Sequence, residues 1–120
     1  VIVIDLSDQK LAYYQDGFRL AAHAVSTGRW NFPTPIGEFA IQNKIPRAYS
    51  KTYGLYMPWW MAFYKGAYGI HELPEWPNGR KEGANHLGTP VSHGCIRLGL
   101  GPAKEVYDWA EVGTKVIVQK

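Results

Sequence analysis

The chain has 120 residues and a mass of 13.5 kDa, which allows one compact domain with its own core and is too short for two. Hydrophobic residues make up 46% and charged residues 19%, the proportions of an ordinary globular domain, which exclude wholesale disorder. The formal charge of +3 comes from scattered basic residues without a nucleic-acid signature, and no apolar run approaches the roughly 20 residues that a membrane span needs.

Turn formers and large flat side chains are frequent: 13 Gly and 8 Pro accompany five Trp, eight Tyr and four Phe. This mixture predicts a mostly β domain rather than a helical bundle. β-branched runs or alternating patterns predict early strands over 1–4, 10–14, 18–25 and 38–42. The Asp16–Gly17 pair predicts a hairpin turn between the second and third of these strands.

Alternation in the strand over 18–25 predicts which of its faces is apolar. Positions of period two share a face, so we expect His23 on the solvated face with no functional role. The opposite, apolar face would carry Phe18, Leu20, Ala22 and Ala24.

The rest of the chain predicts irregular segments before a single helix. Residues 46–52 are polar and predict a surface excursion, and the aromatic segment 53–64 predicts an irregular or edge strand because it contains Pro58. Residues 72–89 predict a long functional loop. A helix is predicted over 102–109, with apolar residues at helical spacing, and a last strand over 116–118.

The single cysteine, Cys95, is the residue most capable of chemistry. It excludes a disulfide within the chain and a Cys-rich zinc ribbon. A lone Cys is either a packed apolar residue or a reactive thiol, and a thiol needs a base such as histidine to take its proton. Three histidines lie upstream, His71, His86 and His93. A zinc site is the other interpretation, but His93 and Cys95 are too close in sequence for the usual spacing, so we predict no metal and no cofactor.

Neighbours of Cys95 fit nucleophilic catalysis. Gly94 permits a tight turn that exposes backbone N–H groups to a substrate carbonyl, and Arg97 could bind a carboxylate close to the thiol.

The string Ser92-His93-Gly94-Cys95-Ile96-Arg97-Leu98, preceded by Gly69-Ile70-His71, resembles the signature of the L,D-transpeptidase catalytic domain, or YkuD-type, family. Further motifs follow in the family's order: 1–6 with 10–14, Ser26-Thr27-Gly28, Thr34-Pro35-Ile36-Gly37-Glu38-Phe39, and Gly113-Thr114-x-Val116. The resemblance implies a YkuD-like β-sandwich of mixed strands with one late α-helix and a long active-site loop, in one domain over 1–120.

The resemblance also implies roles for individual residues. Cys95 matches the nucleophile. His71 matches the general base, which takes the proton of the Cys95 thiol and so makes it a thiolate. His93, Gly94 and Cys95 match the segment whose N–H groups form the oxyanion hole. Ser92 matches a position that steadies this loop, and Arg97 a position that contacts substrate or fixes the loop.

Two departures from the family pattern concern the stretch after the base. Cys95 follows His71 by 24 positions, several more than the family's common spacing, and the surplus lies around residues 76–81. Glu72 stands where a small residue is common. We expect its backbone carbonyl to orient the imidazole while its carboxylate points to solvent. We rank His86 well below His71 as the base.

The implied reaction is the attack of Cys95 on the bond before the terminal D-Ala of a peptidoglycan tetrapeptide stem. The thioester is then transferred to an acceptor amine, which gives a 3-3 cross-link or a wall-protein attachment. Alternatives are a Cys/His hydrolase of wall peptides (an L,D-carboxypeptidase) and a non-catalytic aromatic-rich wall-binding module. Tyr56 and Trp59 are candidate substrate contacts.

The partners implied are peptidoglycan stem peptides and, as a covalent adduct, a carbapenem-type β-lactam. We expect no nucleic acid partner, no membrane span in this chain and a monomer. The implied location is extracytoplasmic, in the periplasm or cell wall, with any targeting segment outside this sequence.

Overall fold

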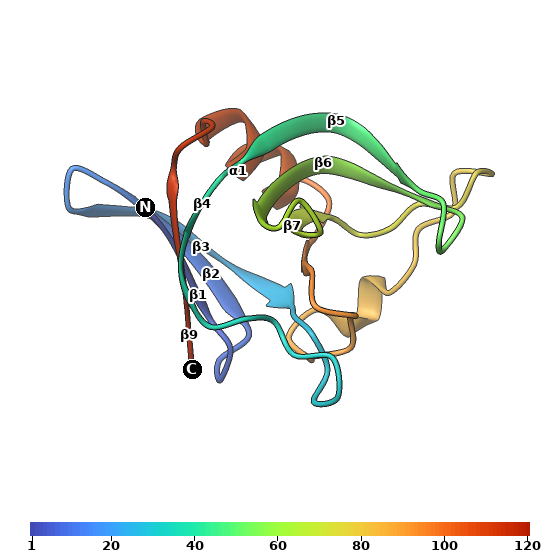
Figure 1. Ribbon diagram of the computed structural model, residues 1–120, viewed down its shortest axis with the longest axis horizontal. Helices are drawn as coiled ribbons and strands as arrows, with labels where there is room; N and C mark the ends of the chain where they lie inside the picture. Colours follow the sequence, from blue (N-terminus) through green and yellow to red (C-terminus); the bar gives the residue numbers. More distant parts are fainter.

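The computed structural model describes residues 1–120 apart from the side chain at position 84, and the described residues form a nine-stranded sheet and one α-helix (Figure 1). The strands are β1 (Ile2–Asp5), β2 (Lys10–Gln15), β3 (Phe18–Ser26), β4 (Gly37–Ala40), β5 (Asn43–Ser50), β6 (Leu55–Tyr64), β7 (Tyr68–Glu72), β8 (Ile96–Leu98) and β9 (Lys115–Gln119). The helix α1 spans Pro102–Trp109, and a 3-10 turn, η1, spans Ala84–His86.

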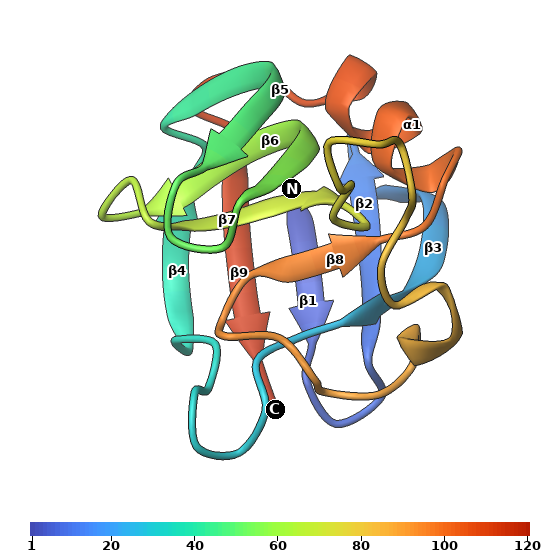
Figure 2. The same ribbon diagram turned by 90° about the vertical axis from the view of Figure 1, so that its right-hand side faces the viewer.

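The sheet has the order β4-β9-β1-β2-β3-β8-β7-β6-β5 and is mixed, because β1 pairs with β9 and β7 with β8 in parallel. It curls so that the half containing β1, β2, β4 and β9 lies behind the half containing β6, β7 and β8 (Figure 2). Strand β3 joins the halves, pairing with β2 along most of its length and with β8 at Val25 and Ser26. The predicted mixed, mostly β fold is confirmed.

The core fills the space between the two halves and under α1. Alternate residues of β1, Ile2 and Ile4, are fully buried, as are Val116 and Val118 of the neighbouring β9. The helix begins and ends at the predicted residues and turns Ala103 and Val106 into the core. Burial of each large aliphatic side chain contributes about 1.5–3 kcal/mol, so this layer stabilises the platform beneath β7 and β8.

The hairpin between β2 and β3 confirms the turn predicted at Asp16–Gly17. Both residues have positive φ, 52° and 83°, as the common two-residue turn between antiparallel strands requires. The predicted apolar face of β3 is wrong: Phe18 is 75% exposed and Leu20 is 49% exposed. The register of β3 with β2 turns the other face inward, where His23 contacts the Glu105 carboxylate of α1 at 2.7 Å.

Two further segments differ from the prediction. Residues 46–52 are not a surface excursion, because most of them belong to β5. This strand lies at the sheet edge, where a proline is tolerated, and its pairing with β6 skips Pro46. Strand β6 is irregular as predicted but interior, between β5 and β7. The short strand β8 had no sequence signal of its own.

No helix among the described residues is both long and apolar enough to cross a membrane.

Candidate active site

The two parallel strands β7 and β8 bring His71 and Cys95 together. Ile70 pairs with Ile96, which places Cys95, just before β8, opposite Gly69. Because residues two apart share a face of a strand, His71 and Cys95 lie on the same face of adjacent strands. Both line one pocket of about 220 Å³.

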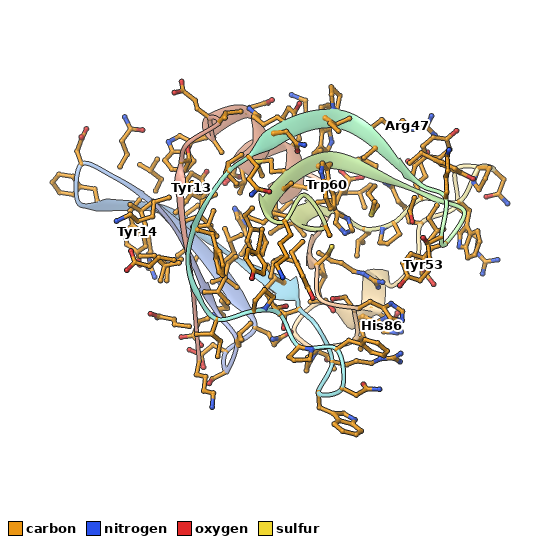
Figure 3. The ribbon with its side chains drawn as sticks, viewed as in Figure 1. Tyr13, Tyr14, Arg47, Tyr53, Trp60 and His86 are labelled. Carbon is orange, nitrogen blue, oxygen red and sulfur yellow. The ribbon has the colours of Figure 1, made fainter. Side chains whose placement is uncertain are left out.

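The imidazole of His71 is held on both sides. Its Nδ1 donates to the backbone carbonyl of Glu72 at 2.6 Å, which leaves Nε2 as the ring nitrogen able to accept a proton. The ring of Trp60, on β6, stacks on it with centroids 5.7 Å apart (Figure 3 labels Trp60). Burial lowers the pKa of His71 to about 4, against the Glu72 hydrogen bond and with help from the charges of Arg97 and Lys81. The imidazole is therefore neutral at pH 7.

Burial also raises the pKa of the Cys95 thiol, while a hydrogen bond from the Gly69 backbone and the charge of Arg97 lower it. The thiol contacts the Ala67 carbonyl at 3.6 Å. Burial therefore favours the uncharged forms of both the thiol and the imidazole, whereas the charge of Arg97 favours the thiolate.

Ser92 holds the loop that carries the thiol. Its hydroxyl donates to the carbonyl of Cys95 at 2.6 Å and accepts from the N–H of Gly94 at 3.1 Å. Gly94 has a φ of 123°, and a side chain there would meet the ring of Tyr68. Because Ser92 takes the N–H of Gly94, the donors of this segment without a partner among the described residues are the N–H groups of His93 and Cys95.

A second layer of hydrogen bonds connects this loop to the end of β3. The hydroxyl of the buried Thr34 accepts from Gly28 N–H at 3.0 Å and donates to the Gly94 carbonyl at 2.7 Å. The Ser92 N–H donates to Thr27 and its carbonyl accepts from Arg29, both at 3.0 Å. Thr34 belongs to the Thr34-Pro35 motif of the resemblance but was not predicted as a site residue. The sequence feature that could have indicated it is a polar residue held between two prolines.

His93 is an exposed rim residue. Its ring stacks on Tyr53 with centroids 5.0 Å apart and packs against Phe32 at 5.1 Å. Figure 3 shows Tyr53 at the turn between β5 and β6. His93, Tyr53 and Trp76 all line the pocket, and the last two are aromatic wall residues that sequence reasoning did not single out.

Arg97 also lines the pocket, directly beside His71 in the strand register. Its guanidinium forms no ion pair or hydrogen bond with the described residues. Burial lowers its pKa, against the charges of Glu82 and Cys95, but an arginine remains protonated at any pH of interest.

The structure does not bring Tyr56 or Trp59 to the pocket. Trp59 packs on Tyr107 of α1 with centroids 5.1 Å apart, and Tyr56 lies under the guanidinium of Arg47 at 3.7 Å. Neither is a lining residue, so we do not retain them as substrate contacts. His86 is exposed on η1 and is not among the lining residues either.

The carbonyl of Glu72 orients the imidazole as predicted, but its carboxylate does not point to solvent. The side chain is buried and forms an ion pair with Lys81 from the following loop. Within the described residues, no group of three metal-binding side chains lies close enough to hold an ion.

Comparisons with known proteins agree with the resemblance. A family model for the L,D-transpeptidase catalytic domain matches residues 1–118. A curated relative, the putative L,D-transpeptidase YkuD of Bacillus licheniformis, is 28% identical over 117 residues, 98% of this chain and 64% of that protein. An L,D-transpeptidase structure from Mycobacterium smegmatis has a TM-score of 0.83 at 29% identity and covers 99% of this chain and 58% of that one.

A structure described as the Ldtfm–avibactam carbamoyl enzyme has a TM-score of 0.79 at 30% identity and covers 99% of this chain and 48% of that one. The chain thus spans less than two thirds of the length of each of these relatives. Since the family model extends over nearly the whole sequence, the chain belongs to the L,D-transpeptidase catalytic domain family.

Proposed function

We propose that this chain is the catalytic domain of a peptidoglycan L,D-transpeptidase that uses Cys95 as nucleophile and His71 as general base, and that it acts outside the cytoplasm. The observation that carries the proposal is the shared face of β7 and β8, from which both side chains line one pocket. Membership of the family supports the substrate class, a tetrapeptide stem with a terminal D-Ala.

The first half of the reaction forms the acyl-enzyme. His71 Nε2 takes the Cys95 proton while the sulfur attacks the carbonyl carbon before D-Ala. The N–H groups of His93 and Cys95 face the oxygen as it becomes negative. When the C–N bond breaks, the imidazolium returns its proton to the departing amine, and a thioester remains on Cys95.

The second half transfers the acyl group. An acceptor amine attacks the thioester carbon, His71 takes its proton, and the C–S bond breaks to return the thiol. Tyr53, Pro74 and Trp76 form a largely apolar wall of the pocket in which this step takes place.

Intact-mass spectrometry after exposure to imipenem tests the proposal. We expect one covalent adduct per chain on the wild type and none on Cys95→Ser, because the lone thiol is the only one in the sequence. A solved L,D-transpeptidase of the same fold is in complex with imipenem, which supports this choice of probe. An unmodified wild type, or an adduct that survives Cys95→Ser, contradicts the nucleophile assignment. Tetrapeptide that yields D-Ala without any cross-linked product identifies a hydrolase instead.

Arg97 is proposed to bind the carboxylate of the terminal D-Ala. Its donors have no partner among the described residues, and it lies in the pocket with the thiol. Arg97→Lys keeps the charge but loses the planar fork that binds both carboxylate oxygens, so we expect KM for the tetrapeptide to rise about tenfold. The control is the same donor with a C-terminal amide, for which both proteins should have similar KM. An equal effect on both donors would assign Arg97 to the loop rather than to the carboxylate.

A further inference from the structure

The carbonyl that orients His71 belongs to a segment held by a lysine from the long loop. His71 Nδ1 donates to the Glu72 carbonyl at 2.6 Å, and the Glu72 carboxylate pairs with the ammonium of Lys81. The same ammonium lies 3.2 Å from a carboxylate oxygen of Glu75 and 3.4 Å from the carbonyl of Leu73, to which it donates. Lys81 therefore binds three groups of the segment directly after the base.

This ion pair is largely shielded from solvent, unlike the contact between Arg47 and Glu75, which holds the outer part of the loop. The side chains of Glu72 and Lys81 are 9% and 21% exposed, whereas Arg47, which contacts Glu75 at 2.9 Å, is 51% exposed. Figure 3 shows Arg47 on β5, the edge strand. Removing one partner of a buried pair leaves an uncompensated charge, and removing a partner of an exposed pair changes little.

The charged groups around the imidazole come from three elements. Glu72 follows it on β7, and Lys81 approaches from the loop. Arg97 and the Cys95 thiol lie on the β8 side. Glu82 of the loop and His93, just before β8, line the same pocket. The neighbour from β6 is the uncharged ring of Trp60. The charges of Lys81 and Arg97 both lower the pKa of His71. Without Lys81, the ring would lose one of these cations and gain an unpaired carboxylate on the adjacent residue.

We propose that Lys81 and Glu72 are positioning residues for His71: their ion pair fixes the peptide carbonyl against Nδ1 and cancels the carboxylate charge beside the ring. The inference rests on the proposed function, in which His71 is the base.

The test is the pH dependence of Cys95 acylation by imipenem in variants of the full chain. The acylation rate falls at low pH where His71 becomes protonated, and this fall is the acid limb of the profile. Lys81→Met should move the acid limb to higher pH by about one unit, because an unpaired carboxylate stabilises the imidazolium. The double variant Lys81→Met with Glu72→Gln removes both charges and should return the limb toward its wild-type position. Arg47→Met is the matched control: it loosens the loop without changing the charges beside His71 and should leave the limb in place.

An unmoved limb in Lys81→Met overturns the proposal, and so does an equal movement in Arg47→Met. If Lys81→Met does not fold, Glu72→Gln tests the proposal through a shift in the opposite direction. The ammonium of Lys81 then remains without the Glu72 carboxylate, so the acid limb of the acylation profile should move to lower pH. An acid limb that stays in place or moves to higher pH overturns the proposal. Wild-type acylation, measured in the same series, reports on the proposed function separately.

Discussion

Replacing His71 by glutamine is expected to slow the acylation of Cys95 by imipenem about 10²- to 10⁴-fold at pH 7, the range of a lost general base. Glutamine can still donate to the Glu72 carbonyl but cannot take the thiol proton, and the neutral imidazole is the base that the pocket supplies. Stopped-flow measurement of adduct formation gives the rate directly.

The pH profile adds a reading that misfolding cannot imitate. Because burial lowers the pKa of His71 to about 4, wild-type acylation should fall only as the pH drops through that value, where the imidazolium forms. The glutamine variant should lack this limb. Its thiol should titrate close to the wild-type value, since a neutral imidazole gives the sulfur no charge to lose.

His86→Gln is the matched control for this prediction. His86 lies in the same loop region of the sequence but is exposed on η1 and does not line the pocket. Its replacement should leave both the rate and the acid limb unchanged. Loss of acylation in His86→Gln with a normal rate in His71→Gln would reverse the assignment of the base.

Much of this fold can be predicted from short sequence patterns, because single strands, turns and helices depend mainly on interactions between residues close in sequence. The β-branched run of 1–4, the Asp16–Gly17 turn, and the apolar stripe of residues 102–109 each specify one element without help from the rest of the molecule. The face of β3 is different. Its pairing with β2 shifts register between Tyr13 and Tyr14, and the inward His23 contacts Glu105 of α1; neither contact can be read from the alternation of residues 18–25.

The same distinction holds for the site. The resemblance named Cys95 and His71, and the parallel pairing of β7 with β8 brings them to one pocket. Aromatic content alone could not separate Trp59, which packs on α1, from Tyr53, which lies on the pocket wall. Nor could spacing reveal the ion pair of Glu72 with Lys81, since a nine-residue separation across a loop has no fixed geometry.

The nucleophile loop depends on a close backbone approach at Gly28. A Cβ at this position would lie 2.1 Å from the Phe32 carbonyl oxygen, 2.8 Å from the Thr34 nitrogen and 2.9 Å from the Gly94 Cα. All three are backbone atoms, so no side chain can rotate away, and the segment after β3 must move off the loop that carries Cys95. That movement would break the hydrogen bonds from Gly28 to the Thr34 hydroxyl and from this hydroxyl to Gly94.

Gly28→Ala is therefore expected to lower the free energy of unfolding by about 3 kcal/mol, as overpacking adds to the loss of buried hydrogen bonds. Acylation of the folded fraction should fall by about 10² or more, because a displacement near 1 Å at the nucleophile has that effect. Urea denaturation and stopped-flow acylation measure the two quantities on one preparation.

Gly17→Ala separates stability from catalysis. Its φ of 83° makes alanine unfavourable there, yet a Cβ meets nothing within 4 Å and the hairpin turn is remote from the pocket. It should cost about 1 kcal/mol and leave the acylation rate of the folded protein unchanged. If Gly28→Ala also lowers stability without slowing acylation, the close contact between the Gly28 and Gly94 backbones does not position the thiol. A loss of rate in Gly28→Ala alone shows that this contact does position it.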